Sequence, residues 1–66
     1  MRERMTEFEY IIEYLDENGV ARDAAMQFFA THEEAERLAE QVLGNVQGRQ
    51  PWVHAYRVVS IPVPHL

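Results

Sequence analysis

The three histidines are the residues of this chain that could hold a metal ion, because imidazole nitrogens are common ligands of zinc and iron. His32, His54 and His65 lie far apart in the sequence, and neither a short paired spacing nor an HExxH motif occurs. The chain has no cysteine, which excludes thiolate ligands, cysteine nucleophiles and disulfides. We therefore expect no metal site and no cofactor.

The carboxylates are numerous, but their spacing is typical of solvated faces rather than of catalytic pairs. Some alternate with apolar residues between 8 and 15, and others recur at helical spacing between 33 and 40. A catalytic carboxylate needs a pocket that shifts its pKa, and so small a chain has little room for one. Ser60 is the only serine, and neither a nucleophile elbow nor a glycine-rich phosphate loop occurs. We therefore expect no catalytic residues and no enzymatic activity.

A rival hypothesis is a small acid–base enzyme or ligand-binding domain that uses His54 with Glu13. It would be favoured by a closed pocket with a buried and strongly perturbed histidine or glutamate.

Trp52, Tyr56 and Arg57 combine aromatic rings with a cation, as stacking platforms for nucleic acids do. In an extended strand, however, Trp52 and Tyr56 share a face from which Arg57 points away. The net charge is −5, there is no lysine, and residues 5–43 hold ten acids against two arginines. A basic footprint is missing, so we expect neither direct nucleic-acid binding nor attraction to an anionic membrane surface.

Residues 8–15 are predicted to form a strand, because aromatic and β-branched residues alternate there with acids. Asp16 and Gly19 predict a type I turn closed by a bulged glycine, which pairs Asp16 with Val20. A two-residue turn at Asn18-Gly19 is the alternative. Hydrophobic matching favours the bulged turn, because a slip of one residue would move every side chain to the other face.

Residues 20–30 are predicted to be a second strand in which Arg22 faces Tyr14 and Met26 faces Tyr10. A long helix from residue 21 onward competes with this interpretation, since alanine, arginine, methionine and glutamine favour helices. Thr31 argues against it, because a threonine three residues before Glu34 is typical of a helix start.

The helix is predicted over residues 31–43, where apolar residues recur at helical spacing. Gly44 suits a left-handed cap at its end, and residues 45–51 are expected to be a loop. Residues 52–61 are rich in aromatic and β-branched residues and predict a third strand that Pro62 and Pro64 end.

These elements predict an α+β fold of order ββαβ, in one small domain that covers residues 1–66. A right-handed crossover makes the third strand parallel to the second, so the sheet order is 2-1-3 with one helix on one face. We expect residues 1–5 to be frayed or disordered and residues 62–66 to form a proline-containing tail.

The face of the sheet away from the helix is the most informative feature. Arg57 fits there, because it could pair across strands with Glu9 or Glu13, and this choice turns Trp52, His54, Tyr56 and Val58 inward. The reverse orientation would expose Trp52, Tyr56 and Val58 instead. Either way the uncovered face is apolar, and such patches usually mark interfaces. The interface candidates are Ile11, Leu15, Phe29, Val53, Val59 and Ile61.

The predicted function is that of a non-enzymatic protein-interaction module in the cytoplasm, acting as a homodimer or higher oligomer through stacked sheets. Pairing at the edge of the second strand is the second choice. No signal peptide and no apolar run long enough to span a membrane is seen in the sequence.

An acidic surface is the other candidate contact, and its residues are Glu9, Glu13, Glu33, Glu36 and Glu40. In size, charge and lack of catalytic motifs the chain resembles small phage or mobile-element accessory proteins, including anti-CRISPR-type inhibitors. The anionic surface gives an alternative function of this kind, in which it mimics nucleic acid and occupies a basic groove of a host protein.

Overall fold

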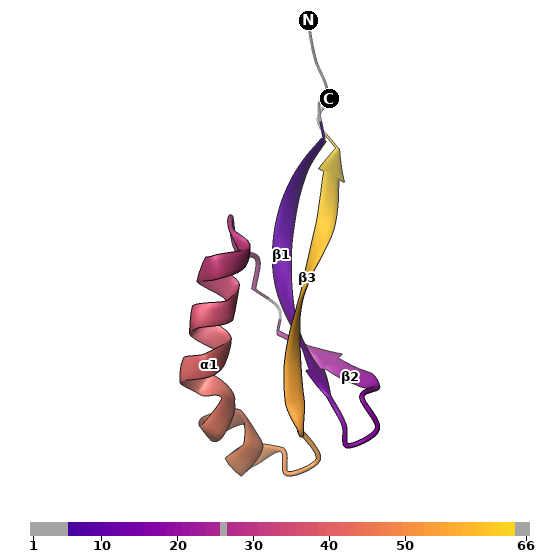
Figure 1. Ribbon diagram of the computed structural model, residues 1–66, viewed down its shortest axis with the longest axis vertical. Helices are drawn as coiled ribbons and strands as arrows, with labels where there is room; N and C mark the ends of the chain where they lie inside the picture. The colour runs from indigo at the N-terminus through magenta and orange to yellow at the C-terminus, as the bar shows by residue number, and fades with distance from the viewer. Residues whose placement is uncertain (1–5, 26, 65–66) are drawn as a thin grey trace, which may run out of the picture.

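The computed structural model describes residues 6–25 and 27–64, which contain three strands and one helix (Figure 1). These elements are β1 (Thr6–Leu15), β2 (Ala21–Ala24), α1 (His32–Arg49) and β3 (Ala55–Pro64). The sheet order is β2-β1-β3, and β1 is antiparallel to both neighbours. The helix packs on one face of the sheet. The predicted α+β fold is therefore confirmed, while the expectation for residues 1–5 lies outside the described residues.

The turn after β1 has the predicted bulged geometry. Gly19 donates its backbone N–H to the Asp16 carbonyl, and Asp16 donates its own to the Val20 carbonyl, both at 2.9 Å. The φ of Gly19 is 79°, a left-handed conformation that glycine adopts without strain. The Asp16 carboxylate accepts the N–H groups of Asn18 and Val20 at 2.8 and 3.0 Å. The bond from Val20 is the largest cause of the lowered pKa of this carboxyl, and the Asn18 bond and the Arg22 charge lower it further.

The second strand is shorter than the predicted span of 20–30, and its register differs. Tyr14 faces Asp23 rather than Arg22, because Arg22 is the extra residue of a bulge. Regular pairing stops after four residues, in a segment of alanine and aspartate that has low strand propensity. The Asp23 carboxylate accepts the N–H of Ala24 at 2.8 Å. This N–H lies on the open edge of β2, because Ala24 and Glu13 form a non-hydrogen-bonded pair.

The chain then leaves β1 and returns to it at one point. Ala25 donates its N–H to the Ile12 carbonyl at 2.9 Å, and Phe29 next exchanges two backbone bonds with Tyr10 at 2.9 and 3.0 Å. Phe29 thus occupies the position predicted for Met26, which is not among the described residues. Ala25 and Phe29 are four residues apart, whereas their partners Ile12 and Tyr10 are only two apart, so this segment holds two residues more than a regular strand would. As a result, Ala25 and Phe29 pack against the core, and the predicted place of Phe29 on the outer face is wrong.

The helix begins as predicted. Thr31 has an extended backbone, and its side-chain oxygen accepts the N–H of Glu34 at 3.1 Å. This bond satisfies one of the amide groups that a helix start leaves unpaired. Glu33 and Glu34 lie in the first turn, where the helix dipole favours negative charge.

The helix ends later than predicted, since it passes through Gly44 and continues to Arg49. Val46 is only 7% exposed and belongs to the core. Burying a valine contributes about 1.5–3 kcal/mol, which exceeds the cost of about 1 kcal/mol for a glycine inside a helix. Gln50 donates its N–H to the Val46 carbonyl at 2.8 Å and caps the last turn. The predicted cap at Gly44 and loop at residues 45–51 are therefore wrong.

The core between helix and sheet is small. Ile12 is the largest fully buried side chain among the described residues, and it packs with Ala35 and Ala39 of α1, both 0% exposed. Alanines at these positions let the helix lie close to β1. Tyr14 is also buried, and this burial raises the pKa of its hydroxyl. The stability of the fold thus depends on few large side chains.

The third strand starts and ends three residues later than predicted, and Pro62 and Pro64 lie within it. The N–H and C=O groups of Tyr10 both point toward Phe29 and so away from β3. Backbone direction alternates along a strand, so the N–H and C=O groups of Phe8, two residues away, also point away from β3. Pro62 pairs with Phe8 and therefore loses no bond to β1. An edge strand tolerates proline in this orientation, and the predicted proline-containing tail instead continues the strand as far as Pro64.

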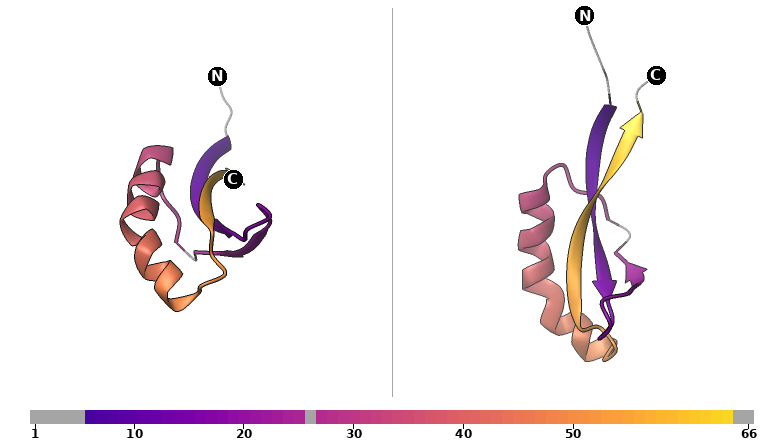
Figure 2. Two further views of the ribbon diagram at one scale, coloured as in Figure 1. Left: turned by 60° about the horizontal axis from the view of Figure 1, so that its bottom comes forward. Right: turned by 45° about the vertical axis from the view of Figure 1, so that its right-hand side comes forward.

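The paired ends of β1 and β3 extend beyond the helix as a two-stranded ribbon (Figure 2). The radius of gyration is 13.9 Å, whereas a compact chain of this length has one of about 11 Å. Phe8 lies on the ribbon and is 52% exposed. A two-stranded ribbon is only marginally stable by itself. The molecule is therefore elongated, with one end that its own helix does not cover.

Replacing Gly44 or Gly48 with alanine is expected to raise the free energy of unfolding by about 0.5–1 kcal/mol each. Both lie on the exposed side of α1, and an added Cβ would meet nothing within 4 Å. Denaturant unfolding measures the change, with Gly19→Ala as the control. Gly19 also has open space, but its φ of 79° should make alanine destabilising, by about 1 kcal/mol. A destabilising Gly44→Ala would contradict the continuous helix.

Candidate interaction surfaces

The face of the sheet away from α1, here called the outer face, is built by alternate residues of β1 and β3. Ile11 lies opposite Val59, Glu9 opposite Ile61, and Leu15 opposite Ala55. Each is half-buried, and none belongs to the core cluster that packs with α1. Four of the predicted interface candidates lie on this face, namely Ile11, Leu15, Val59 and Ile61.

An ion pair lies on the outer face between the Ile11–Val59 and Leu15–Ala55 pairs, as predicted for Arg57. Glu13 and Arg57 are directly opposite each other in the β1–β3 register. The Arg57 Nη2 and Nε atoms donate to Oε1 of Glu13 at 2.6 and 3.1 Å. The side chains are 51% and 25% exposed for Arg57 and Glu13, so the pair contributes at most about 1 kcal/mol. Its main effect is to neutralise the carboxylate within an apolar surface.

The two other interface candidates are not on the outer face. Val53 is 3% exposed and belongs to the core, and Phe29 packs against that core. Val53 precedes β3 in a connection that is tied to the helix. It donates its N–H to the Gln50 carbonyl at 3.0 Å, and the Gln47 amide donates to its carbonyl at 3.3 Å. Strand alternation does not apply to this connection, which is why the prediction for Val53 was wrong.

The inward side of β3 is partly as predicted. Tyr56 and Val58 pack against the core, which confirms their direction. Trp52 and His54 are exposed instead, because they precede the strand rather than forming part of it. Desolvation is the largest cause of the raised pKa of the Tyr56 hydroxyl, and the nearby Glu40 and Glu36 carboxylates raise it further.

The acidic candidates fall into two groups that the structure does not bring together. Glu9 and Glu13 lie on the outer face, and Glu13 is already paired with Arg57. Glu33, Glu36 and Glu40 are exposed on α1, which covers the opposite face of the sheet. Glu36 has a cationic neighbour if His32 is protonated, with Oε1 of Glu36 at 3.8 Å from Nδ1 of His32.

Residues 8–25 and 27–63 contain no buried polar or charged side chain, and the part of the chain that the structure describes contains no cluster of three potential metal ligands. His32 makes an edge contact with Tyr10 at 6.0 Å between ring centres. His65 is not among the described residues. Within the same part of the chain, no helix is long and apolar enough to cross a bilayer.

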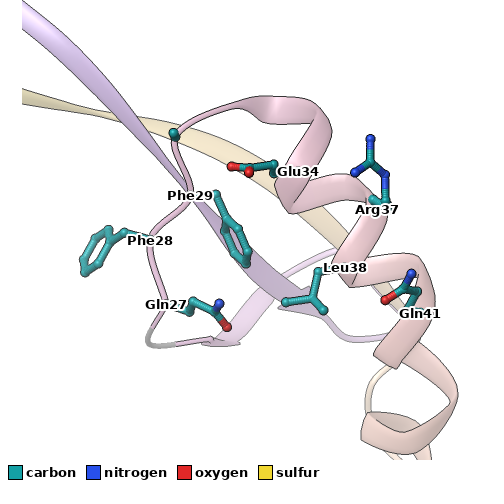
Figure 3. Close-up of a pocket in the computed structure, with 8 residues that line it drawn as sticks. Gln27, Phe28, Phe29, Glu34, Arg37, Leu38 and Gln41 are labelled. Atoms are coloured by element: carbon teal, nitrogen blue, oxygen red, sulfur yellow. The ribbon is translucent and has the colours of Figure 1, made fainter.

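Two exposed aromatic residues were not recognised from the sequence. Phe8 and Phe28 are 52% and 56% exposed. Phe28 borders an open groove of about 460 Å³ between residues 27–30 and α1 (Figure 3). Phe8 lies in the part of β1 that the helix does not cover, and the irregular path after β2 places Phe28 at the surface.

Comparisons with protein-family models, with curated proteins and with solved structures found no match for this chain.

Proposed function

We propose that this chain is a protein-interaction module that binds a second copy of itself through the outer face of its sheet. The observation that carries the proposal is the apolar surface of Ile11, Leu15, Val59 and Ile61, which the helix leaves uncovered. Apolar side chains gathered on a sheet face that no other element covers often mark a binding site. The absence of cysteine suits a reducing compartment, and we place the action of the protein in the cytoplasm.

A stacked pair of outer faces would bury the apolar residues of both copies. β1 and β3 each have ten residues, so the shared face is about 34 Å long, and two such sheets pack about 10 Å apart. The Glu13–Arg57 pair is already neutral within one chain. Two-fold stacking therefore brings no unpaired charge from Glu13 or Arg57 into the contact, and the Glu9 carboxylate on the same face is accommodated at the solvated rim.

Edge pairing of β2 has less support than face stacking. The strand has only four residues, and the Ala24 N–H already bonds to the Asp23 carboxylate. A short edge whose donors are used locally is a poor template for another strand. The acidic inhibitor hypothesis remains an alternative, but the separation of the two acidic groups gives it no additional support.

Sedimentation of the purified chain over a range of concentrations tests the proposal. We expect a reversible dimer or higher oligomer that dissociates on dilution through the micromolar range, since apolar faces of this size give modest affinity. A compact monomer at all concentrations up to the highest soluble one would refute self-association.

A further inference from the structure

A groove runs between residues 27–30 and the first half of α1, on the side of the molecule opposite the outer face. It is formed by Gln27, Phe28, Phe29 and Ala30 on one side and by Glu34, Arg37, Leu38 and Gln41 on the other, and its volume is about 460 Å³. Phe29 and Leu38 point into it, whereas Phe28 points away from the helix (Figure 3). The groove thus has an apolar floor and polar walls.

The backbone along the groove forms one isolated bridge with β1, at Phe29. The peptide units on both sides of Phe29 are planar and trans, so the Phe28 carbonyl and the Ala30 N–H point away from β1. No β1 residue borders the groove. Gln27, Phe28 and Ala30 are all exposed, and no backbone hydrogen bond between described residues uses the amides of Phe28 or Ala30.

We propose that this groove binds an extended peptide segment of another protein, which adds to the edge at residues 27–30 and lies against α1. An edge strand flanked by a helix is a recurring way to bind peptides, with backbone bonds for affinity and side-chain pockets for specificity. Phe29 and Leu38 would receive an apolar peptide side chain. Gln27 and Gln41 each offer an amide donor and acceptor beside the peptide backbone.

Charge on the helix wall specifies the peptide further. Glu34 and Arg37 both border the groove, and residues three apart on a helix are separated by about 5–6 Å. Side chains two apart in an extended peptide share a face and are about 6.6 Å apart. A peptide with a basic residue two positions from an acidic residue therefore matches Glu34 and Arg37 together.

The test is selection of displayed random heptapeptides on the full-length chain, followed by fluorescence anisotropy with one selected peptide made synthetically. We expect the selected peptides to share an apolar residue and the base–acid pair. Arg37→Glu should weaken binding of this peptide roughly tenfold, because an attraction becomes a repulsion. Changing the peptide's acid to lysine should restore binding to the Arg37→Glu chain. Arg37 is exposed, so this variant should keep the fold.

The control is Val59→Asp on the outer face. The affinity of this variant for the selected peptide should stay within about twofold of that of the parent chain, because the groove and the outer face lie on opposite sides of the sheet. Conversely, Arg37→Glu should leave self-association unchanged, so failure of one proposal does not imply failure of the other. Selection of no common peptide pattern would overturn the inference, as would equal affinity of the selected peptide for the parent and Arg37→Glu chains.

Discussion

Ile12→Ala is expected to lower the free energy of unfolding by about 2–5 kcal/mol. Ile12 is 1% exposed and is the largest fully buried side chain of the described residues. Its neighbours Ala35 and Ala39 are too small to fill the cavity that the substitution leaves. A domain of this length has a total stability of about 3–10 kcal/mol. We therefore expect a large drop in the unfolding midpoint, and partial unfolding at 37 °C, measured by circular dichroism in urea.

Ile11→Ala is the matched control, because it removes the same atoms from the adjacent residue on the opposite face. Ile11 lies on the outer face and is half-buried in the single chain. At concentrations where the protein is monomeric, its substitution should cost less than about 1 kcal/mol. Equal effects of the two alanine variants under those conditions would contradict the assignment of Ile12 to the core and Ile11 to the outer face.

Val59→Asp is expected to weaken self-association by about 3 kcal/mol or more, which is more than a hundredfold in Kd. Val59 lies opposite Ile11 in the centre of the outer face. A two-fold contact would bury two aspartates for each dimer, and the nearby Arg57 on this face is already paired with Glu13. Sedimentation equilibrium measures the change, and circular dichroism shows whether the monomer keeps its fold.

Ser60→Asp is the control for this variant. Ser60 is the next residue of β3, is exposed, and points to the opposite face. The Ser60→Asp chain carries the same new charge outside the proposed contact. The affinity with which this variant dimerises should therefore stay close to that of the parent chain. If both variants weaken association equally, net charge rather than the outer face controls it.

Local signals in the sequence were sufficient for the parts of the fold that depend on neighbouring residues. The turn at Asp16 and Gly19 and the helix start at Thr31 were predicted correctly, because each is fixed by hydrogen bonds within four residues. The alternation in β1 was also sufficient, since the period of a strand sets its two faces. Together with the handedness of the crossover, these signals gave the order β2-β1-β3.

The outer face was partly predictable for the same reason. Ile11 and Leu15 follow from the alternation of β1, and Val59 and Ile61 follow once Arg57 is placed opposite Glu13. The assignment of Arg57 succeeded because burying a charge under the helix would cost far more than pairing it at the surface.

The remaining features were decided by tertiary packing. The sequence contains a suitable cap at Gly44, yet the helix continues because Val46 finds a place in the core. The bulge at Arg22 and the gap before Phe29 depend on how β2 and its extension fit against β1 and α1. Val53 is buried by its ties to Gln47 and Gln50 rather than by strand alternation.

The composition and strand pattern thus determined the architecture and an apolar outer face, because both depend on short-range periodicity. The groove beside α1 depends on one bulge, an irregular return to β1 and a helix that approaches closely through Ala35 and Ala39. Each of these reflects a balance of about 1–3 kcal/mol between local preference and burial of a side chain. Such a balance depends on which distant residues meet, so only the tertiary structure decides it.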